Sequence, residues 1–148
     1  MDNVQVLNMN LADFEQIEPI YNSCFDTFWT PLNLKSELEN ENYQSIVAKI
    51  DNKIVGFASI WFSVDDAHIT NIAVHNNHRK QGIASRMLER IISIAKEHNK
   101  TSLTLEVNIK NTIAQKLYLK YGFKNLGIRK NYYNGTDDAY IMTLYFIQ

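Results

Sequence analysis

An amphipathic segment with a strand pattern on each side constrains this fold more than any other feature of the sequence. Apolar residues recur at helical spacing in the segment 82–100. The stripe that they form consists of Ile83, Met87, Leu88, Ile91, Ile94 and Ala95. The flanking segments 67–74 (AHITNIAV) and 101–107 (TSLTLEV) are rich in β-branched and aliphatic residues, which is typical of strands. A helix that buries one face between two strands predicts a sheet covered by helices.

The remaining elements predict the same layered architecture. Asn10 is expected to cap the first helix, and Thr30 with Pro31 to open the second. The expected strands lie in 4–9, 45–50, 53–64, 67–74, 101–107, 123–133 and 137–146, and the expected helices in 11–25, 31–41, 82–100 and 111–121. We therefore predict one domain over residues 1–148, of the α/β (α+β) class. Its mixed, mostly antiparallel central sheet would have about seven strands flanked by about four helices.

Composition and charge exclude several classes of protein. With 148 residues, 45% hydrophobic and 21% charged, the chain has the composition of one globular domain. Its formal net charge of −1 creates no field toward nucleic acid or an anionic membrane, so we expect neither partner. The one cysteine, Cys24, cannot form an internal disulfide, and the N-terminus has no apolar signal segment. These features predict a cytoplasmic protein.

A basic loop, RKQGIA (79–84), lies between the strand 67–74 and the helix that follows. Gly82 lets the backbone approach a ligand, and the new helix directs its free N–H groups and positive dipole end outward. Arg79 and Lys80 add positive charge, so the segment predicts an anion site. It lacks the glycine patterns of a dinucleotide fold and of a P-loop. The alternative is a solvated basic loop in which Gly82 only starts the helix.

The same region resembles the central motif of the GCN5-related N-acetyltransferases (GNATs), which reads R/Q-x-x-G-x-G/A after a strand. Arg79, Gly82 and Ala84 match this motif. The segment 103–123 is similar to the next strand and helix of that superfamily. The segment 128–142 (IRKNYYNGTDDAYIM) resembles the branch that acetylates protein N-termini, typified by the RimI-type ribosomal-protein-alanine N-acetyltransferases. The resemblance implies a single GNAT domain.

The likeness runs from Asp65 to Leu144, whereas residues 1–64 match in pattern only. It implies acetyl-coenzyme A (acetyl-CoA) as cosubstrate. We expect no metal, because His75 and His78 have no third ligand near them in the sequence. In such a fold one strand splays from its neighbour, the thioester arm bonds to it like an extra strand, and a backbone N–H can stabilise the thioester oxyanion. The positions that would contact acetyl-CoA are Ile72, Ala73, Val74, Arg79, Lys80, Gln81, Gly82, Ile83, Ala84, Ser85 and Asn111.

Glu106 and Tyr118 match the two catalytic positions of the resembled branch. The opposite face of the strand that carries Glu106 consists of Leu103, Leu105 and Val107. The resemblance implies that Glu106 is the general base, acting through water. An α-amine with a pKa of ~7.7–8 needs a weaker base than a lysine at ~10.4. The resemblance also implies that Tyr118 is the general acid toward the leaving thiolate. Alternatively, Glu106 is an edge-strand carboxylate in solvent or pairs with a lysine, and Tyr118 is a core aromatic.

Three aromatic residues are implied to bind the acceptor. Tyr132 and Tyr133 would grip the backbone of its first residues, and Trp29 would wall the pocket for its first side chain. Strand tyrosines also serve in cross-strand packing, and Asn111 would cap its helix besides contacting acetyl-CoA. We expect an N-acetyltransferase that acts on the N-terminal alanine of a small-subunit ribosomal protein. The alternatives are other protein N-termini, a small-molecule amine, or a non-catalytic acetyl-CoA-binding module.

Overall fold

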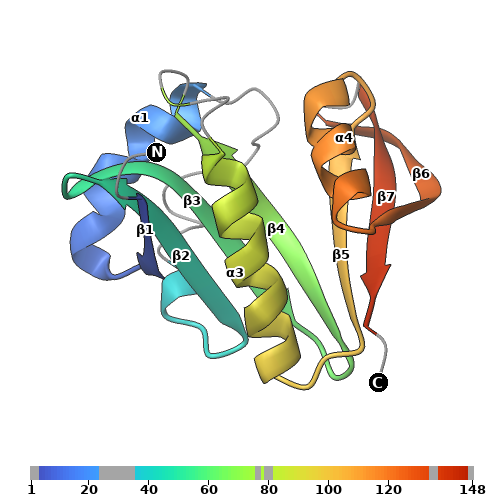
Figure 1. The fold of residues 1–148 in the computed structure, drawn as a ribbon, viewed down its shortest axis with the longest axis horizontal. Helices are drawn as coiled ribbons and strands as arrows, with labels where there is room; N and C mark the ends of the chain where they lie inside the picture. The colour runs from blue at the N-terminus through green and yellow to red at the C-terminus, as the bar shows by residue number, and fades with distance from the viewer. Residues whose placement is uncertain (1–3, 24–35, 76–77, 79–81, 134–136, 147–148) are drawn as a thin grey trace.

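The computed structural model describes residues 4–23, 36–75, 78, 82–133 and 137–146. Within them, seven strands form one sheet in the order β1-β2-β3-β4-β5-β7-β6 (Figure 1). The strands are β1 (Val4–Asn8), β2 (Tyr43–Ile50), β3 (Lys53–Phe62), β4 (Asp66–Val74), β5 (Ser102–Asn108), β6 (Lys124–Tyr133) and β7 (Asp137–Tyr145). Neighbouring strands are antiparallel except β4 and β5, which are parallel. The predicted mixed, mostly antiparallel sheet is confirmed.

Helices cover both faces of this sheet. They are α1 (Phe14–Ser23), which follows a 3-10 turn at Leu11–Asp13, α3 (Ile83–Glu97) and α4 (Thr112–Lys120). α3 and α4 contribute to one apolar cluster, and α1 contributes to a second cluster on the other side of the sheet. Residues 36–38 are helical, but the start of the predicted second helix, at Thr30 and Pro31, lies outside the described residues.

Local sequence signals account well for the elements near the site. All six residues of the stripe predicted for the segment 82–100 are buried in α3. Asp51 and Asn52, between β2 and β3, have φ values of 52° and 64°, the left-handed conformation that a type I′ hairpin turn requires. Helical spacing would also put Ile113 on the inward face of α4, but its side chain is 69% exposed. The inward stripe of α4 is narrower and consists of Ala114, Leu117, Tyr118 and Tyr121.

Strands β4 and β5 pair over a short stretch and then separate. The pairing joins Asp66–Ile69 to Ser102–Leu105 and ends there. β4 continues along β3, and β5 continues along β7. The register of β4 on β3 passes from Ile69 to Asn71, which leaves Thr70 as an extra residue in a β-bulge. Because a bulge bends and twists its strand, this one directs the end of β4 away from β5 (Figure 1).

Candidate active site

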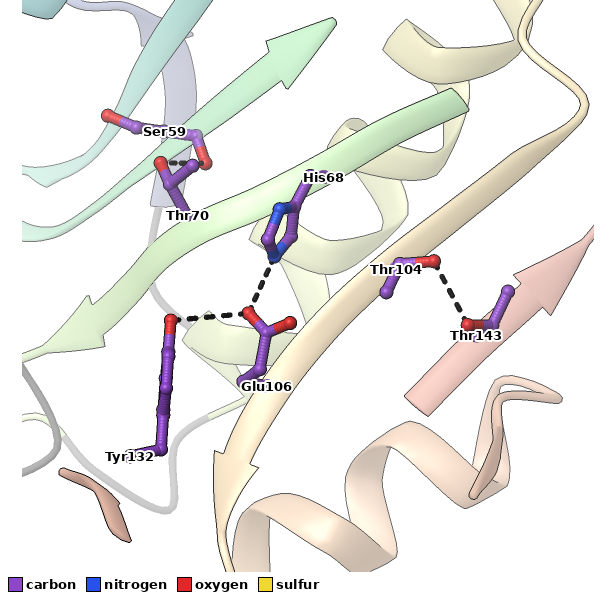
Figure 2. Close-up of polar contacts among 7 residues, drawn as sticks. All are labelled: Ser59, His68, Thr70, Thr104, Glu106, Tyr132 and Thr143. Carbon is purple, nitrogen blue, oxygen red and sulfur yellow. Dashed lines mark hydrogen bonds and ion pairs between the residues drawn. The ribbon is translucent and has the colours of Figure 1, made fainter. Parts of the chain in front are cut away.

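A buried carboxylate lies where β4 and β5 separate. Glu106 on β5 directly follows Leu105, the last residue that pairs with β4. Its side chain is 6% exposed, and its Oε1 lies 2.7 Å from Nε2 of His68 on β4. The hydroxyl of Tyr132 on β6 donates a long hydrogen bond of 3.4 Å to the same oxygen (Figure 2). Three strands thus converge on one carboxylate oxygen.

Strand alternation places this group on the face of the sheet opposite α3. Leu105 and Val107, on either side of Glu106, belong to the apolar cluster that packs against α3. Ala67 and Ile69, on either side of His68, belong to the same cluster. Since successive side chains of a strand point to opposite faces, Glu106 and His68 share the other face. The alternative of an edge-strand carboxylate in solvent is therefore wrong, because β5 is an interior strand of the sheet.

Electrostatics keep Glu106 ionised despite its burial. Burial by itself would raise the pKa of the carboxyl group. The hydrogen bond and charge of His68, the charge of Arg129 and the hydrogen bond from Tyr132 outweigh burial, so the pKa of Glu106 lies below its ordinary value of 4.5. Burial and the nearby Glu106 charge raise the pKa of Tyr132 above 10.0. At neutral pH the site therefore holds a carboxylate beside a protonated phenol.

Contacts on the β6–β7 hairpin hold Tyr132 in this place. The guanidinium carbon of Arg129 lies 5.1 Å from the centre of the Tyr132 ring, a cation–π contact. Two residues further along the hairpin, the backbone N–H of Asn131 donates to Asp138 Oδ1 at 2.9 Å. At the end of β5, Nδ2 of Asn108 donates to Asp137 at 3.0 Å. Side-chain hydrogen bonds thus join the two strands of the hairpin to each other and to β5, the strand that carries Glu106.

The ends of α4 fix the position of Tyr118. At the start of the helix, Oδ1 of Asn111 accepts a hydrogen bond from the Ala114 N–H at 3.1 Å, so the predicted cap is confirmed. At its end, the N–H of Gly122 donates to the Leu119 carbonyl, and the N–H of Phe123 donates to the Tyr118 carbonyl. These two bonds and the φ of 97° at Gly122 make a Schellman motif.

Tyr118 packs in the core on the α3 side of the sheet. Its side chain is 5% exposed, and its ring centre lies 5.7 Å from that of Phe123. Glu106 points to the opposite face, so the two predicted catalytic residues approach the β4–β5 fork from different sides of the sheet. The ladder between β4 and β5 has ended at that level, and no hydrogen-bonded strand pair separates the two sides there.

The described acetyl-CoA positions lie along the diverging end of β4 and the start of α3. Ala73 and Val74 are buried and Ile72 is half-buried. Gly82 is the N-cap of α3, with a φ of 80°, and Ile83, Ala84 and Ser85 form the first turn. A strand end without a ladder to β5 and a helix N-terminus beside it suit an extended thioester arm that ends in phosphates. Arg79, Lys80 and Gln81 lie outside the described residues.

The structure does not describe the side chains of two residues predicted to bind the acceptor. Trp29 lies outside the described residues, as does the side chain of Tyr133, whose backbone pairs with Asp137.

In the part of the chain that the structure describes, no group of three or more His, Cys, Asp or Glu residues is placed to hold a metal ion. Within those same ranges, no helix is long and apolar enough to cross a membrane.

The profile of the acetyltransferase (GNAT) family matches residues 14–123. The chain belongs to the GNAT family. A Bacillus subtilis protein provisionally named a ribosomal protein bS18-alanine N-acetyltransferase is 39% identical over 140 residues, covering 93% of this chain and 92% of that protein. The ribosomal protein bS18-alanine N-acetyltransferase of Haemophilus ducreyi is 32% identical, covering 90% of this chain and 94% of its own. The expected GNAT membership is confirmed.

Solved structures give the same assignment. The ribosomal-protein-S18-alanine N-acetyltransferase of Escherichia coli superposes on this GNAT chain with a TM-score of 0.90 at 28% identity, covering 99% of this chain and 96% of the other. A GNAT family acetyltransferase from Elizabethkingia anophelis, solved with acetyl-CoA bound, superposes with a TM-score of 0.79 at 24% identity, covering 99% and 100%. At 24% identity, the second likeness shows a shared fold only.

Sequence reasoning missed two members of this GNAT site, His68 and Arg129. His68 belongs to no motif, and it reaches Glu106 only after β4 and β5 have been brought together. Arg129 lies in the segment 128–142, three residues before Tyr132, but its charge acts on Glu106 only once β6 has joined the sheet. One weak signal was available for His68. It alternates with Ala67 and Ile69 in a predicted strand, and so lies on the same side as Thr70, away from the apolar face.

Proposed function

We propose that this GNAT chain transfers the acetyl group of acetyl-CoA to a protein N-terminal α-amine. The acceptor that we propose is the N-terminal alanine of ribosomal protein bS18, a small-subunit ribosomal protein. The observation that carries the proposal is the buried, ionised Glu106 at the β4–β5 fork. The names of the relatives that match over nine-tenths of the chain support the choice of acceptor. A ribosomal acceptor is consistent with the cytoplasmic location expected from the sequence.

Glu106 serves as the general base in this proposal. A protein N-terminus has a pKa of ~7.7–8, so roughly a tenth or more of it is unprotonated at neutral pH, against about one lysine in a thousand. The carboxylate accepts the proton, directly or through water, as the amine nitrogen attacks the acetyl carbon. The chemistry that acetyl-CoA supplies is an activated acetyl thioester. Tyr118 donates its phenolic proton to the departing sulfur, whose pKa of about 8.5 lies below that of the phenol.

The separating strand and the helix start are proposed to hold acetyl-CoA. Backbone groups of Ile72, Ala73 and Val74 would bond to its extended arm, and the segment from Arg79 to Ser85 would bind its pyrophosphate. The positive φ of Gly82 supports this, because the turn before α3 accepts glycine more readily than other residues. Asn111 would contact acetyl-CoA while it caps α4.

The β6–β7 hairpin is proposed to hold the acceptor peptide. Tyr132 lies against Glu106, so a peptide backbone gripped there would present its amine to the base. Tyr133 and Trp29 are proposed to complete the grip and the first side-chain pocket. The position of Tyr132 favours a peptide over a small amine, since it places the hairpin directly beside the proposed base. Other protein N-termini remain the second candidate for the acceptor.

A peptide screen tests this function. Short peptides with the bS18 N-terminal sequence would be offered with acetyl-CoA, alongside versions that begin with serine, methionine or proline. A version with a blocked N-terminus and a free lysine serves as the control. We expect acetylation at the α-amine of the alanine peptide and none at lysine, with the site located by mass spectrometry. Turnover of a small amine without any peptide acetylation would overturn the proposal.

A further inference from the structure

Nothing in the proposed chemistry uses His68, although it lies closer to the proposed base than the Tyr132 hydroxyl does. Its Nε2 lies 2.7 Å from Oε1 of Glu106. The two side chains differ sharply in their access to water, since 29% of the His68 side chain is exposed and 6% of the Glu106 side chain. The more exposed imidazole of His68 thus contacts the buried carboxylate of Glu106 directly (Figure 2).

The proposed base has to release each proton that it accepts. The lowered pKa of Glu106 makes it a poor place for a proton to stay. An imidazole has an ordinary pKa of ~6.5, much closer to the ~7.7–8 of an α-amine. Transfer of the proton onward to an imidazole thus costs less free energy than retention on the carboxylate. Exit straight from Glu106 to water is hindered by its burial.

We propose that His68 is the proton-relay residue of this site, which takes from Glu106 the proton of the acceptor amine and passes it to solvent. This inference rests on the proposed role of Glu106 as general base. His68 acts through Glu106 and has no contact with the reacting atoms in the proposal, so it is a positioning residue. It also orients the carboxylate, because the Nε2–Oε1 contact fixes one of the two oxygens.

The relay balances in protons and bonds. While Glu106 is ionised, the Nε2–H of His68 donates to its Oε1. Once the carboxylate has taken the amine proton, exchange with water leaves the neutral ring with its hydrogen on Nδ1 and its Nε2 lone pair facing the carboxyl group. The O–H bond then breaks as an N–H bond forms at Nε2, which leaves a carboxylate beside an imidazolium. The exposed part of the ring then releases a proton to water, and exchange with solvent restores the starting tautomer. The net result is one proton moved from the amine to water.

The groups around the pair come from four strands. β6 brings Tyr132 and the charge of Arg129 to Glu106. On β4, Asp66 shares the face of His68 two residues away, and the Ser102 hydroxyl donates to it at 2.6 Å. On β3, the residue paired with His68 is Trp61, and on β5 it is Thr104, neither of which titrates. Among these described neighbours, no group other than the imidazole belongs to a residue type with an ordinary pKa near neutral pH.

The substitution His68→Gln tests the relay in the full-length enzyme. Glutamine keeps a polar group that can bond to Glu106 but does not titrate near neutral pH. With acetyl-CoA and an alanine-first peptide at saturation, kcat should fall by about tenfold or more, which is less than the ~10²–10⁴ of a group that itself performs acid–base catalysis, because His68 acts through Glu106. The kcat–pH profile should lose the ionisation near neutral pH, while the melting temperature and acetyl-CoA affinity stay close to wild type.

Two further measurements make the outcome decisive. Ring ¹⁵N shifts of His68 in the wild type and in Glu106→Gln should show that His68 titrates and that its titration depends on Glu106. If His68→Gln keeps the wild-type profile, or slows kcat equally at every pH, the relay is wrong. If Glu106→Gln still loses activity in that case, the base assignment stands. If both variants retain wild-type kcat, the relay and the proposed base fail together.

Discussion

Ile69 and Leu105 are the last two residues that pair across β4 and β5. The next residue of each strand has a distinct role: Thr70 forms the bulge that turns β4 away, and Glu106 places its carboxylate at the fork. The end of one short parallel ladder thus creates both the separated strand and the position of the proposed base.

Glu106→Gln should lower kcat by roughly 10²–10⁴, because the amide keeps the shape of the side chain but accepts no proton. Assays at a pH above the pKa of the acceptor α-amine, ~7.7–8, should recover part of the loss, since the amine then arrives deprotonated. Glu97→Gln is the matched control, because Glu97 forms an exposed pair with Arg90 on α3. Parallel pH–rate profiles for Glu106→Gln and the wild type would contradict the role of Glu106 as base.

Glu106 should also make stability depend on pH. Its pKa is lowered in the folded state, so its ionised form stabilises the fold above the unfolded-state value of 4.5. That contribution is lost as the pH falls below 4.5 through the lowered folded-state pKa. Urea unfolding measures the difference in the free energy of unfolding between the wild type and Glu106→Gln. This difference should be larger at pH 7 than well below pH 4.5. An equal difference at both values would mean that the carboxylate charge does not stabilise the fold.

Tyr118→Phe should reduce turnover far more than it reduces acetyl-CoA affinity. The change removes one hydroxyl and keeps the ring that packs on Phe123, so the melting temperature should change little. Loss of a general acid typically costs ~10²–10⁴ in rate. Tyr145→Phe on β7 is the control, because the Tyr145 side chain is 63% exposed. Steady-state kinetics with wild-type kcat in Tyr118→Phe would assign Tyr118 to packing alone.

Gly122→Ala should destabilise the fold by about 1–2 kcal/mol, the cost of holding an L-residue in the left-handed region. Gly122 has a φ of 97°, and an added Cβ would lie 3.3 Å from Cδ1 of Leu144. Because this residue closes the Schellman motif around Tyr118, kcat should fall as well. In the control, Gly127→Ala, the new Cβ would be 3.7 Å from its nearest neighbour, Ile141. Denaturant unfolding that ranks the two variants equally would contradict this account of the α4 terminus.

Gly82→Glu should abolish acetyl-CoA binding while the far-UV circular dichroism spectrum is retained. The substitution puts bulk and negative charge at the N-terminus of α3, where the pyrophosphate is proposed to bind. Gly82→Ala separates charge from strain, because both variants place an L-residue at a φ of 80°. By calorimetry, the glutamate variant should lose much more affinity than the alanine variant. Unchanged affinity in Gly82→Glu would show that the phosphates bind elsewhere.

Much of the fold follows from local patterns in the sequence. The buried stripe of α3, the left-handed turn at Asp51–Asn52 and the capping of α4 by Asn111 each depend on residues within a few positions of one another. Helical periodicity, turn conformation and capping are short-range effects, so the sequence alone specifies them. The GNAT motif around Gly82 identifies the family for the same reason, since it is contiguous.

The chemistry of the site depends on contacts that no local pattern specifies. Glu106 meets His68 across 38 residues and Tyr132 across 26 residues of sequence. The bulge at Thr70 is a matter of register between β3 and β4, which becomes fixed only when both strands pack. A glutamate in a strand is thus apparent from the sequence. The strands that the tertiary fold brings beside Glu106 decide whether its side chain is exposed or buried. They also decide which groups contact the carboxylate and shift its pKa.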